Sequence, residues 1–373
     1  MNRVAVFSRG GIAPEGSHRH VPSIAALVRR LSSSFDITVY IPLRGDGHTL
    51  PFRCGEAAVR YVDASHDDPA HRVVARMLRA FARDHALRPY TLVHGFWALP
   101  GGIAAVAAGL LWRIPSIASM LGGEAADLPA IGYGNMSRRG SRRATLWTCA
   151  HATRLVLLTR FQRDRLRAFG MRRGEGVSVI PFGAEPEFFG PPARRPPAPP
   201  FNLLNVAHIN RVKDQETMLR ALQRLAPDVQ WTLRIVGEDT LAGELARRAA
   251  ALGLGARVVF AGYAPHGAMR THYDWAHLLV QSSLYEGEGV VVAEASASGL
   301  PVCGTRVGLI ADMGDACAAT EPGDDDAMAE TLRSVLADAR RREALGAGAC
   351  AWASAHDAAW TAAAYADMYR SLS

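Results

Sequence analysis

Two carboxylates and two glycines lie close together in the segment 282–305, which reads SSLYEGEGVVVAEASASGLPVCGT. Glu286 comes just before the glycines Gly287 and Gly289, and Glu294 lies about one helical turn beyond them. Where a strand turns into a helix, backbone N–H groups at such glycines can hold an anionic phosphate at the positive end of the helix. The carboxylates would accept hydrogen bonds from hydroxyl groups. A nucleotide sugar combines both features and fits this pattern.

The elements that must position these residues form a βαβ crossover. Residues 277–281 and 301–304 are typical of short buried strands, and the small residues between them tolerate a helix. The alternative is that residues 290–292, three valines, form a strand after an ordinary acidic turn. Residues 293–298 have too little strand propensity to form a strand, and Gly299, shortly before Pro301, is a typical helix stop. We therefore favour the crossover.

The chain holds 42 lysines and arginines, and only one of them, Lys213, is a lysine. This lysine lies between an expected strand at 203–207 and a helix whose apolar face includes Met218 and Leu222, which places it in a strand-to-helix turn. A compact ammonium suits a point-charge contact with phosphate. The alternative is that the single lysine is a chance result in a chain whose composition favours arginine.

The segment 286–304 resembles the donor-site signature of the retaining nucleotide-sugar glycosyltransferases of family 4, in which seven residues separate two glutamates. The resemblance implies an α/β protein of the GT-B fold. In that fold two Rossmann-like, doubly wound domains face a cleft, and a C-terminal helix crosses back to the first domain. It also implies a retaining hexosyltransferase that moves a sugar from a UDP or GDP sugar to a glycan or lipid-linked acceptor. No cofactor and no metal are expected.

The resemblance also implies roles for individual residues. Lys213 would contact the donor diphosphate and stabilise the leaving group, Glu286 would reach the transferred sugar, and Glu294 would accept hydrogen bonds from the ribose. The remaining donor-binding residues expected from the resemblance and the turn are Gly10, Gly11, Asn210, Tyr263, Gly287, Glu288, Gly289, Val290 and Val291. The charge that grows on the diphosphate would be met by Lys213 and the N–H groups of 289–291.

The chain departs from the family pattern at three positions. His208 stands where an arginine is usual, so we expect Arg211 to supply the missing charge. Leu121 stands where many relatives have a histidine, which shifts the expected catalytic role to Glu124 and His94. His94 follows an expected strand at 90–93, where ligands bind in open α/β sheets, but it can equally be a half-buried structural residue.

Glu288 is the third departure, because relatives usually carry an apolar or aromatic residue there. A carboxylate beside a diphosphate is repulsive. It would contact a donor hydroxyl or amine, or point to solvent, and we favour solvent because an unpaired carboxylate is costly to bury.

Length and composition bound the architecture. A chain of 373 residues, 49% hydrophobic with a mean hydropathy of +0.01, suits two globular domains. We expect an N-terminal acceptor domain at 1–185, a proline-rich linker at 186–200, a nucleotide-sugar domain at 201–351 and a returning helix at 352–373. Five scattered cysteines without a CxxC pair indicate reduced thiols. Neither a signal peptide nor a spanning segment is visible, so we expect a cytoplasmic protein.

Residues 137–173 are strongly basic, with eleven arginines against Asp164 within the range and Glu175 just after it. A solvated surface is the default explanation for a charge run. Such a cluster also attracts anionic lipid head groups or a phosphate-bearing acceptor, so we expect peripheral contact with the inner face of a membrane. Aromatic residues do not alternate with the arginines, which argues against nucleic acid.

Two other functions remain open from the sequence. A nucleotide-sugar epimerase on the same fold would need no acceptor. A non-catalytic module would bind the donor without turnover, which the departures at His208 and Leu121 would explain.

Overall fold

The computed structural model describes residues 2–13, 21–43, 51–65, 67–190, 195–225 and 229–372. Its internal contacts divide the chain into two compact units. Unit 1 comprises Met1–Phe182 and Ala358–Ser373, and unit 2 comprises Gly183–Asp357. Among the described residues, no helix has the length and apolar character needed to cross a lipid bilayer.

Unit 1 is built on an eight-stranded sheet of described residues in the order β3-β4-β2-β1-β5-β6-β7-β8. Its strands are β1 (Arg3–Phe7), β2 (Asp36–Leu43), β3 (Phe52–Cys54), β4 (Ala57–Ser65), β5 (Leu92–Phe96), β6 (Ser116–Met120), β7 (Arg154–Leu157) and β8 (Val177–Val179). All neighbours pair in parallel except β3 with β4. The central strands β5 and β6 are buried along their whole length, as expected for a parallel sheet covered on both faces.

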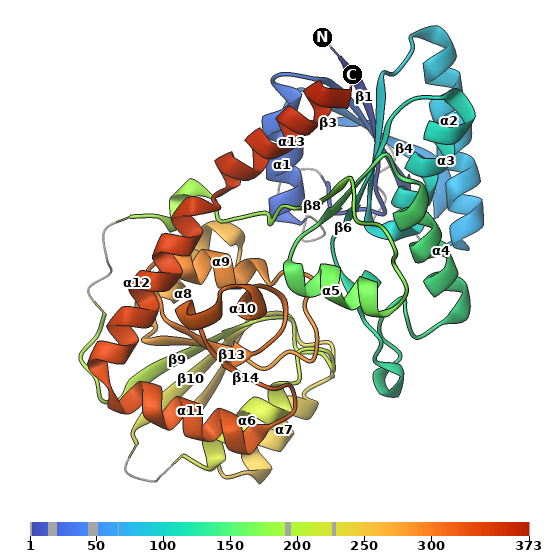
Figure 1. Cartoon of the computed structure of the whole chain (residues 1–373). Helices are drawn as coiled ribbons and strands as arrows, with labels where there is room; N and C mark the ends of the chain where they lie inside the picture. Colours follow the sequence, from blue (N-terminus) through green and yellow to red (C-terminus); the bar gives the residue numbers. More distant parts are fainter. Residues whose placement is uncertain are drawn as a thin grey trace. The chain divides into compact units, whose positions relative to one another are not determined.

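Helices cover both faces of this sheet. They are α1 (Pro22–Ser32), α2 (Ala70–Leu87), α3 (Ile103–Trp112), α4 (Arg139–His151), α5 (Arg160–Ala168) and α13 (Ala358–Leu372). Helices α1 and α13 lie side by side, whereas α2 and α3 pack together on the other side of the strands (Figure 1). The last helix of the chain is therefore part of the first unit.

Unit 2 is a second doubly wound unit, with a six-stranded parallel sheet in the order β11-β10-β9-β12-β13-β14. Its strands are β9 (Phe201–Val206), β10 (Trp231–Val236), β11 (Val258–Gly262), β12 (Leu278–Gln281), β13 (Val302–Thr305) and β14 (Ala318–Thr320). Its helices are α6 (Gln215–Gln223), α7 (Glu244–Ala251), α8 (Met269–Trp275), α9 (Val290–Ala297), α10 (Gly308–Asp312), α11 (Asp325–Ala337) and α12 (Ala339–Ala355). The predicted crossover is confirmed, because α9 connects the parallel neighbours β12 and β13.

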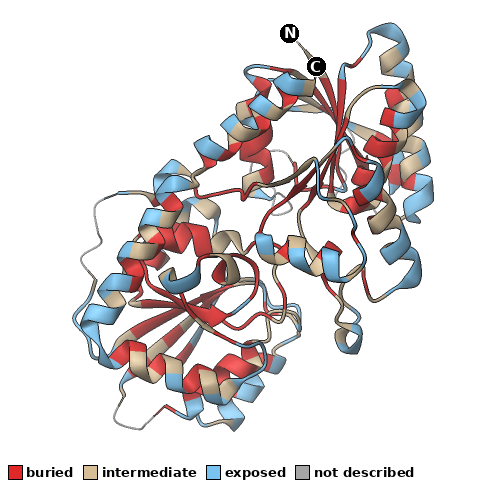
Figure 2. Cartoon of the chain, in the orientation of Figure 1, coloured by how far each residue is buried: buried red, intermediate tan, exposed pale blue. Residues whose placement is uncertain are grey.

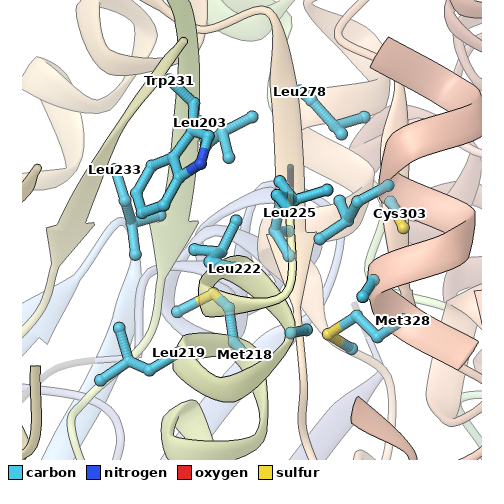
Figure 3. Packing of buried hydrophobic residues seen from close by; sticks show 14 of the residues in the cluster. Leu203, Met218, Leu219, Leu222, Leu225, Trp231, Leu233, Leu278, Cys303 and Met328 are labelled. Carbon is cyan, nitrogen blue, oxygen red and sulfur yellow. The ribbon is translucent and has the colours of Figure 1, made fainter. Parts of the chain in front are cut away.

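Buried residues concentrate in the strands and on the inner faces of the helices in each unit (Figure 2). In unit 2, the apolar face predicted for α6 packs on β9 and β10 (Figure 3). The labelled members of that cluster are Leu203, Met218, Leu219, Leu222, Leu225, Trp231, Leu233, Leu278, Cys303 and Met328. Truncating one of its fully buried leucines to alanine would cost about 2–5 kcal/mol of stability.

Two expected boundaries differ from the structure. The segment after residue 185 is not a free spacer up to residue 200, because Phe188 is fully buried and packs edge-on against Tyr273 in unit 2. The returning helix does not begin at 352, because α12 ends at Ala355 in unit 2 and α13 begins at Ala358. Residues 191–194 of the proline-rich segment and 14–16 of the first glycine loop lie outside the described residues.

Candidate functional site

The turn that follows β9 holds Lys213 in a fixed backbone position. The side-chain oxygen of Asn210 accepts hydrogen bonds from the N–H groups of Val212 and Lys213, at 3.2 and 3.1 Å. The segment after β12 adds two more bonds: Ser282 Oγ donates to the Lys213 carbonyl at 2.9 Å, and Leu284 N–H donates to the Val212 carbonyl at 2.8 Å. The lysine turn and the glutamate segment are therefore tied together through their backbones.

The side chains meet at the same place. Lys213 Nζ lies 2.5 Å from Glu286 Oε1, and Ser283 Oγ donates to that oxygen at 2.6 Å. Both charged side chains are about one-fifth exposed, at 22% and 21%. The ammonium is thus oriented by a carboxylate and still reaches the surface.

The turn before α9 requires glycine, because any other residue would be strained in its backbone conformation. Gly289 has a φ of 89°, in the left-handed region. A Cβ on Gly308, at the start of α10, would lie 2.3 Å from the carbonyl oxygen of Glu288. Val292 N–H, the third of α9, donates to the Gly289 carbonyl at 2.8 Å, whereas the N–H groups that open a helix lie at its positive end and suit an anion.

Glu294 lies in α9 and is 95% buried, since only 5% of it is exposed. Tyr273 OH donates to its Oε2 at 2.6 Å, and His266 Nε2 lies 3.1 Å from its Oε1. The hydrogen bond between His266 and Glu294 raises the pKa of His266, although burial acts in the opposite direction. Each carboxylate oxygen can accept a second hydrogen bond, so the pair of contacts orients Glu294 without using its full acceptor capacity.

Unit 1 contains a cavity of about 680 Å³ at the carboxyl ends of its strands. Its lining residues come from the ends of β1, β2 and β5, the segment from the end of β4 to the start of α2, the loop after β6 and the start of α4. They are Arg9, Pro42, Asp67, Asp68, Ala70, Val73, Trp97, Leu99, Pro100, Gly122, Gly123, Glu124, Gly132, Tyr133, Gly134, Asn135, Arg138 and Ser141. Two guanidinium groups, three carboxylates, two hydroxyl groups, one amide and one indole therefore line a space that fits a small polar molecule.

Glu124 is almost fully buried in the wall of this cavity, with its carboxylate bound by backbone N–H groups. Its Oε1 accepts from Ala98 and Leu121, each at 3.2 Å, and its Oε2 accepts from Gly122 at 2.6 Å. Burial raises the pKa of Glu124, and these hydrogen bonds act in the opposite direction. The carboxylate joins the loop after β5 to the loop after β6.

Trp97 follows β5 with a φ of 59°, a left-handed conformation that is rare for a bulky aromatic residue. The surrounding loop is closely packed: a Cβ on Gly95 would lie 2.3 Å from the carbonyl oxygen of Gly101. The indole lies between the two glycine loops, because a Cβ on Gly11 would lie 3.1 Å from its Cη2 and one on Gly122 3.4 Å from its Nε1.

Comparisons with known proteins agree with this two-unit arrangement. Residues 15–183 match the model "Glycosyl transferase 4-like domain", and residues 192–352 match "Glycosyl transferases group 1". Sucrose-phosphate synthase from Thermosynechococcus elongatus has the same fold, with a TM-score of 0.83 at 19% identity over 100% of this chain and 99% of that one. The chain belongs to the glycosyltransferases of the GT-B fold.

Two further proteins resemble this GT-B glycosyltransferase. The D-inositol 3-phosphate glycosyltransferase of Nocardiopsis dassonvillei is 31% identical over 257 residues, which are 62% of this chain and 58% of that protein's length. The structure of Anabaena Alr3699/HepE in complex with UDP and glucose matches over 100% of both chains, with a TM-score of 0.76 at 17% identity.

The predicted donor residues of this glycosyltransferase fall into two groups. Unit 2 contains the lysine turn, the glycine turn and the start of α9, namely Asn210, Lys213, Glu286, Gly287, Glu288, Gly289, Val290, Val291 and Glu294, and also Tyr263, which is 51% exposed just after β11. Gly10 and Gly11 lie in unit 1, where Gly11 packs against Trp97. Their role toward the donor stays a prediction.

Arg211 does not take the place of the missing arginine. Its Nη2 lies 3.0 Å from Glu244 Oε2, and both side chains are largely exposed. His208 is also exposed, 4.0 Å from Glu238. The expectation that Arg211 supplies charge beside Lys213 is therefore wrong in this structure, because the guanidinium is paired with α7 at the surface.

His94 is a structural residue rather than a catalytic one, which corrects the expected role. It is fully buried, with Nδ1 2.7 Å from Tyr369 OH and Nε2 2.8 Å from Ser119 Oγ. Ser119 Oγ also lies 2.9 Å from Tyr365 OH. Burial lowers the pKa of His94 to about 3, so the imidazole is neutral and links β5, β6 and α13.

The expectation that Glu288 points to solvent is also wrong, since only 3% of the residue is exposed. The sequence missed Tyr273 and His266, because no sequence spacing relates α8, or the turn before it that holds His266, to Glu294 in α9. Trp97 did carry a signal, since it is an aromatic residue just beyond the carboxyl end of a strand.

Within the described ranges, no three His, Cys, Asp or Glu residues are grouped so as to hold a metal ion.

Proposed function

We propose that this GT-B glycosyltransferase moves a sugar from a nucleoside-diphosphate sugar held by unit 2 to an acceptor held by unit 1, with retention of the anomeric configuration. The observation that carries the proposal is the Lys213–Glu286 pair beside the glycine turn and the start of α9. A cation, backbone N–H groups and two carboxylates there match a ligand with a diphosphate and several hydroxyls.

The chemistry follows from where charge develops. As the sugar leaves, negative charge grows on the diphosphate, and the Lys213 ammonium with the first N–H groups of α9 would stabilise it. Glu286 is oriented by Ser283 and Lys213 to accept hydrogen bonds from the transferred sugar. Glu294, oriented by Tyr273 and His266, would accept the ribose hydroxyls. Retention needs a carboxylate nucleophile or attack from the leaving-group face, and both routes remain open.

The donor base is proposed to be uracil or guanine. A protein of the same fold, Anabaena Alr3699/HepE, was solved with UDP and glucose, and one relative is named a GDP-mannose-dependent mannosyltransferase. Tyr263 lies just after β11 in unit 2 and is the residue we expect beside the base.

The acceptor is proposed to carry a phosphate. Arg9 and Arg138 line the cavity of unit 1, and the relative from Nocardiopsis dassonvillei is named for inositol 3-phosphate. Exposed arginines of α4 and α5, among them Arg139, Arg143 and Arg160, would attract anionic head groups. We therefore propose a cytoplasmic enzyme that contacts the inner face of a membrane when the acceptor is lipid-linked.

A mass-spectrometric screen against UDP, GDP and ADP sugars tests the function by measuring nucleoside-diphosphate release. Release that rises when a phosphorylated polyol or glycan is added supports glycosyl transfer. Conversion of the donor to an isomeric nucleotide sugar without any acceptor would instead show an epimerase. Donor binding without turnover across the acceptor panel would show a non-catalytic module.

A further inference from the structure

The strained tryptophan in the cavity of unit 1 is not used by any part of the proposed chemistry. Trp97 is half-buried, lines the cavity and occupies a left-handed backbone conformation. Strain at a bulky residue persists only where the surroundings impose it, and such sites cluster where ligands bind.

Residues before and after Trp97 in the chain hold it in this left-handed conformation. The peptide after Trp97 is held by Glu124, whose carboxylate accepts the Ala98 N–H and also the N–H groups of Leu121 and Gly122. Glycines at 95, 101 and 102 let the backbone fold back on itself, since a Cβ on Gly101 would lie 2.3 Å from the Phe96 carbonyl oxygen. The indole is therefore fixed by the wall of the cavity.

Polar groups line the same cavity as this ring. Arg9 and Arg138 supply positive charge, Asn135 and Ser141 supply an amide and a hydroxyl, and Asp67 and Asp68 supply carboxylates, of which Asp68 is paired with Arg72. An indole face recognises an apolar surface, whereas the groups around it recognise charge and hydroxyls. A cyclic polyol phosphate presents all of these, because one face of its ring is made of C–H groups while its rim carries hydroxyls and phosphate.

We infer that Trp97 is the stacking surface for the ring of the acceptor, and that Glu124 is the positioning residue that holds it. This inference rests on the proposed acceptor role of the cavity and narrows it to a cyclic polyol phosphate. It predicts selection of a ring over an open chain of equal charge.

Binding by the purified full chain tests this without a donor, using saturation-transfer-difference NMR and titration. The probes are a panel of inositol and hexose monophosphates, with glycerol 3-phosphate as the acyclic control. We expect the best cyclic probe to bind the wild type about tenfold more tightly than glycerol 3-phosphate, which is at the upper end of what one aromatic contact contributes. Ring C–H protons should receive the strongest saturation.

The key variant is Trp97→Asn, because asparagine tolerates the left-handed conformation and removes the ring. We expect its preference for the cyclic probe to fall to within about threefold of glycerol 3-phosphate, with acyclic binding unchanged. Trp97→Phe should keep most of the preference. Glu124→Gln loses one acceptor oxygen and should lower the preference for the cyclic probe, because the indole is then held less firmly. If Glu124 acts only through Trp97, the double variant Trp97→Asn/Glu124→Gln should have the same preference as Trp97→Asn alone.

The matched control is Trp112→Asn, a half-buried tryptophan of the same unit that packs on Phe81 outside the cavity lining. It should keep the preference of the wild type. Preference retained in Trp97→Asn, or failure of every cyclic probe to bind the wild type, would overturn the inference. Donor turnover by the wild type is measured separately, so loss of the ring preference and failure of the proposed transferase activity are distinguishable.

Discussion

Lys213 Nζ lies 2.5 Å from Glu286 Oε1, across 73 residues of sequence. The two side chains come from different strand-to-helix connections of unit 2 and are fixed by Asn210 and Ser283. A diphosphate is a stronger partner for an ammonium than one carboxylate, because it carries more negative charge. We expect the lysine to exchange Glu286 for the donor diphosphate, which leaves Glu286 available to the sugar.

Lys213→Ala should lower kcat by about 10²–10³, since one preorganised transition-state contact is typically worth about 2.7–4 kcal/mol. Steady-state nucleoside-diphosphate release measures this. Arg211→Ala is the matched control from the same turn, and its exposed pair with Glu244 predicts activity within about twofold of the wild type. A folded Lys213→Ala protein with normal turnover would disprove the assignment.

Substitutions of Glu286 and Glu294 should change different kinetic parameters. Glu286→Gln should mainly lower kcat, because contacts near the breaking bond strengthen in the transition state. Glu294→Gln should mainly raise the donor KM, because it contacts the ribose equally in both states. Kinetics of both variants and of Glu288→Gln would check the assignment: the greatest loss in Glu288→Gln with a near-normal Glu286→Gln would show that another carboxylate reaches the sugar.

The His266–Glu294 pair makes stability depend on pH with a defined sign. The pKa of His266 is raised in the folded protein, mainly by the hydrogen bond to Glu294 and further by Glu187. Its stabilisation is therefore complete below the unfolded pKa of about 6.5 and is lost as pH rises through the folded value. The Tm difference between wild type and His266→Gln should be largest in mild acid and should shrink at alkaline pH.

His272, in α8, should change the stability with pH in the opposite direction to His266. Burial lowers the pKa of His272, and Arg234 lowers it further. His272 therefore destabilises the fold as pH falls, so His272→Gln should raise Tm relative to the wild type in mild acid. A Tm difference for His266→Gln that does not change with pH would contradict the charged pair.

Turnover should not depend on a divalent cation. In the proposed mechanism, the ammonium of Lys213 and the N–H groups at the start of α9 would take the role that a cation would otherwise fill at a leaving diphosphate. Saturating chelator should leave the rate within about twofold. A complete loss that magnesium or manganese restores would show instead that the diphosphate requires a metal.

The arginines of α4 and α5 should favour anionic membranes. Vesicles with anionic lipid should bind more protein than neutral vesicles, and salt should weaken the binding because it screens exposed charges. Cosedimentation measures both effects. Replacing Arg139, Arg143 and Arg160 by glutamine should reduce binding to anionic vesicles, whereas equal binding to both vesicle types would indicate an acceptor that is not membrane-bound.

Local sequence patterns were sufficient to predict the turn before α9 and most of the fold. The glutamate pair, its glycines and the stop at Gly299 lie on one crossover, so their spacing alone predicted α9 between β12 and β13. The lone lysine was equally informative, because a strand and an amphipathic helix flank it. Such features depend on residues that are near each other in the sequence.

The errors concern contacts between distant residues. The position of His94 at a strand end predicted a ligand contact, but Tyr369, 275 residues later, covers its ring. Arg211 was assigned by proximity to Lys213, whereas Glu244 from α7 determines where its guanidinium lies. The catalytic role of Glu124 stays a prediction, but the sequence did not show that its carboxylate accepts the N–H of Ala98, 26 residues earlier. No periodicity in the sequence encodes these partners.

The hydrogen bonds of α13 also determine the order in which the chain can fold during synthesis. His94 and Ser119 leave the ribosome long before Tyr369 and Tyr365, which follow them by 275 and 246 residues. All of unit 2 is translated in that interval and can fold as a unit of its own. Unit 1 is thus begun before unit 2 and completed after it, and its buried imidazole and serine hydroxyl lack these tyrosine partners until α13 has been synthesised.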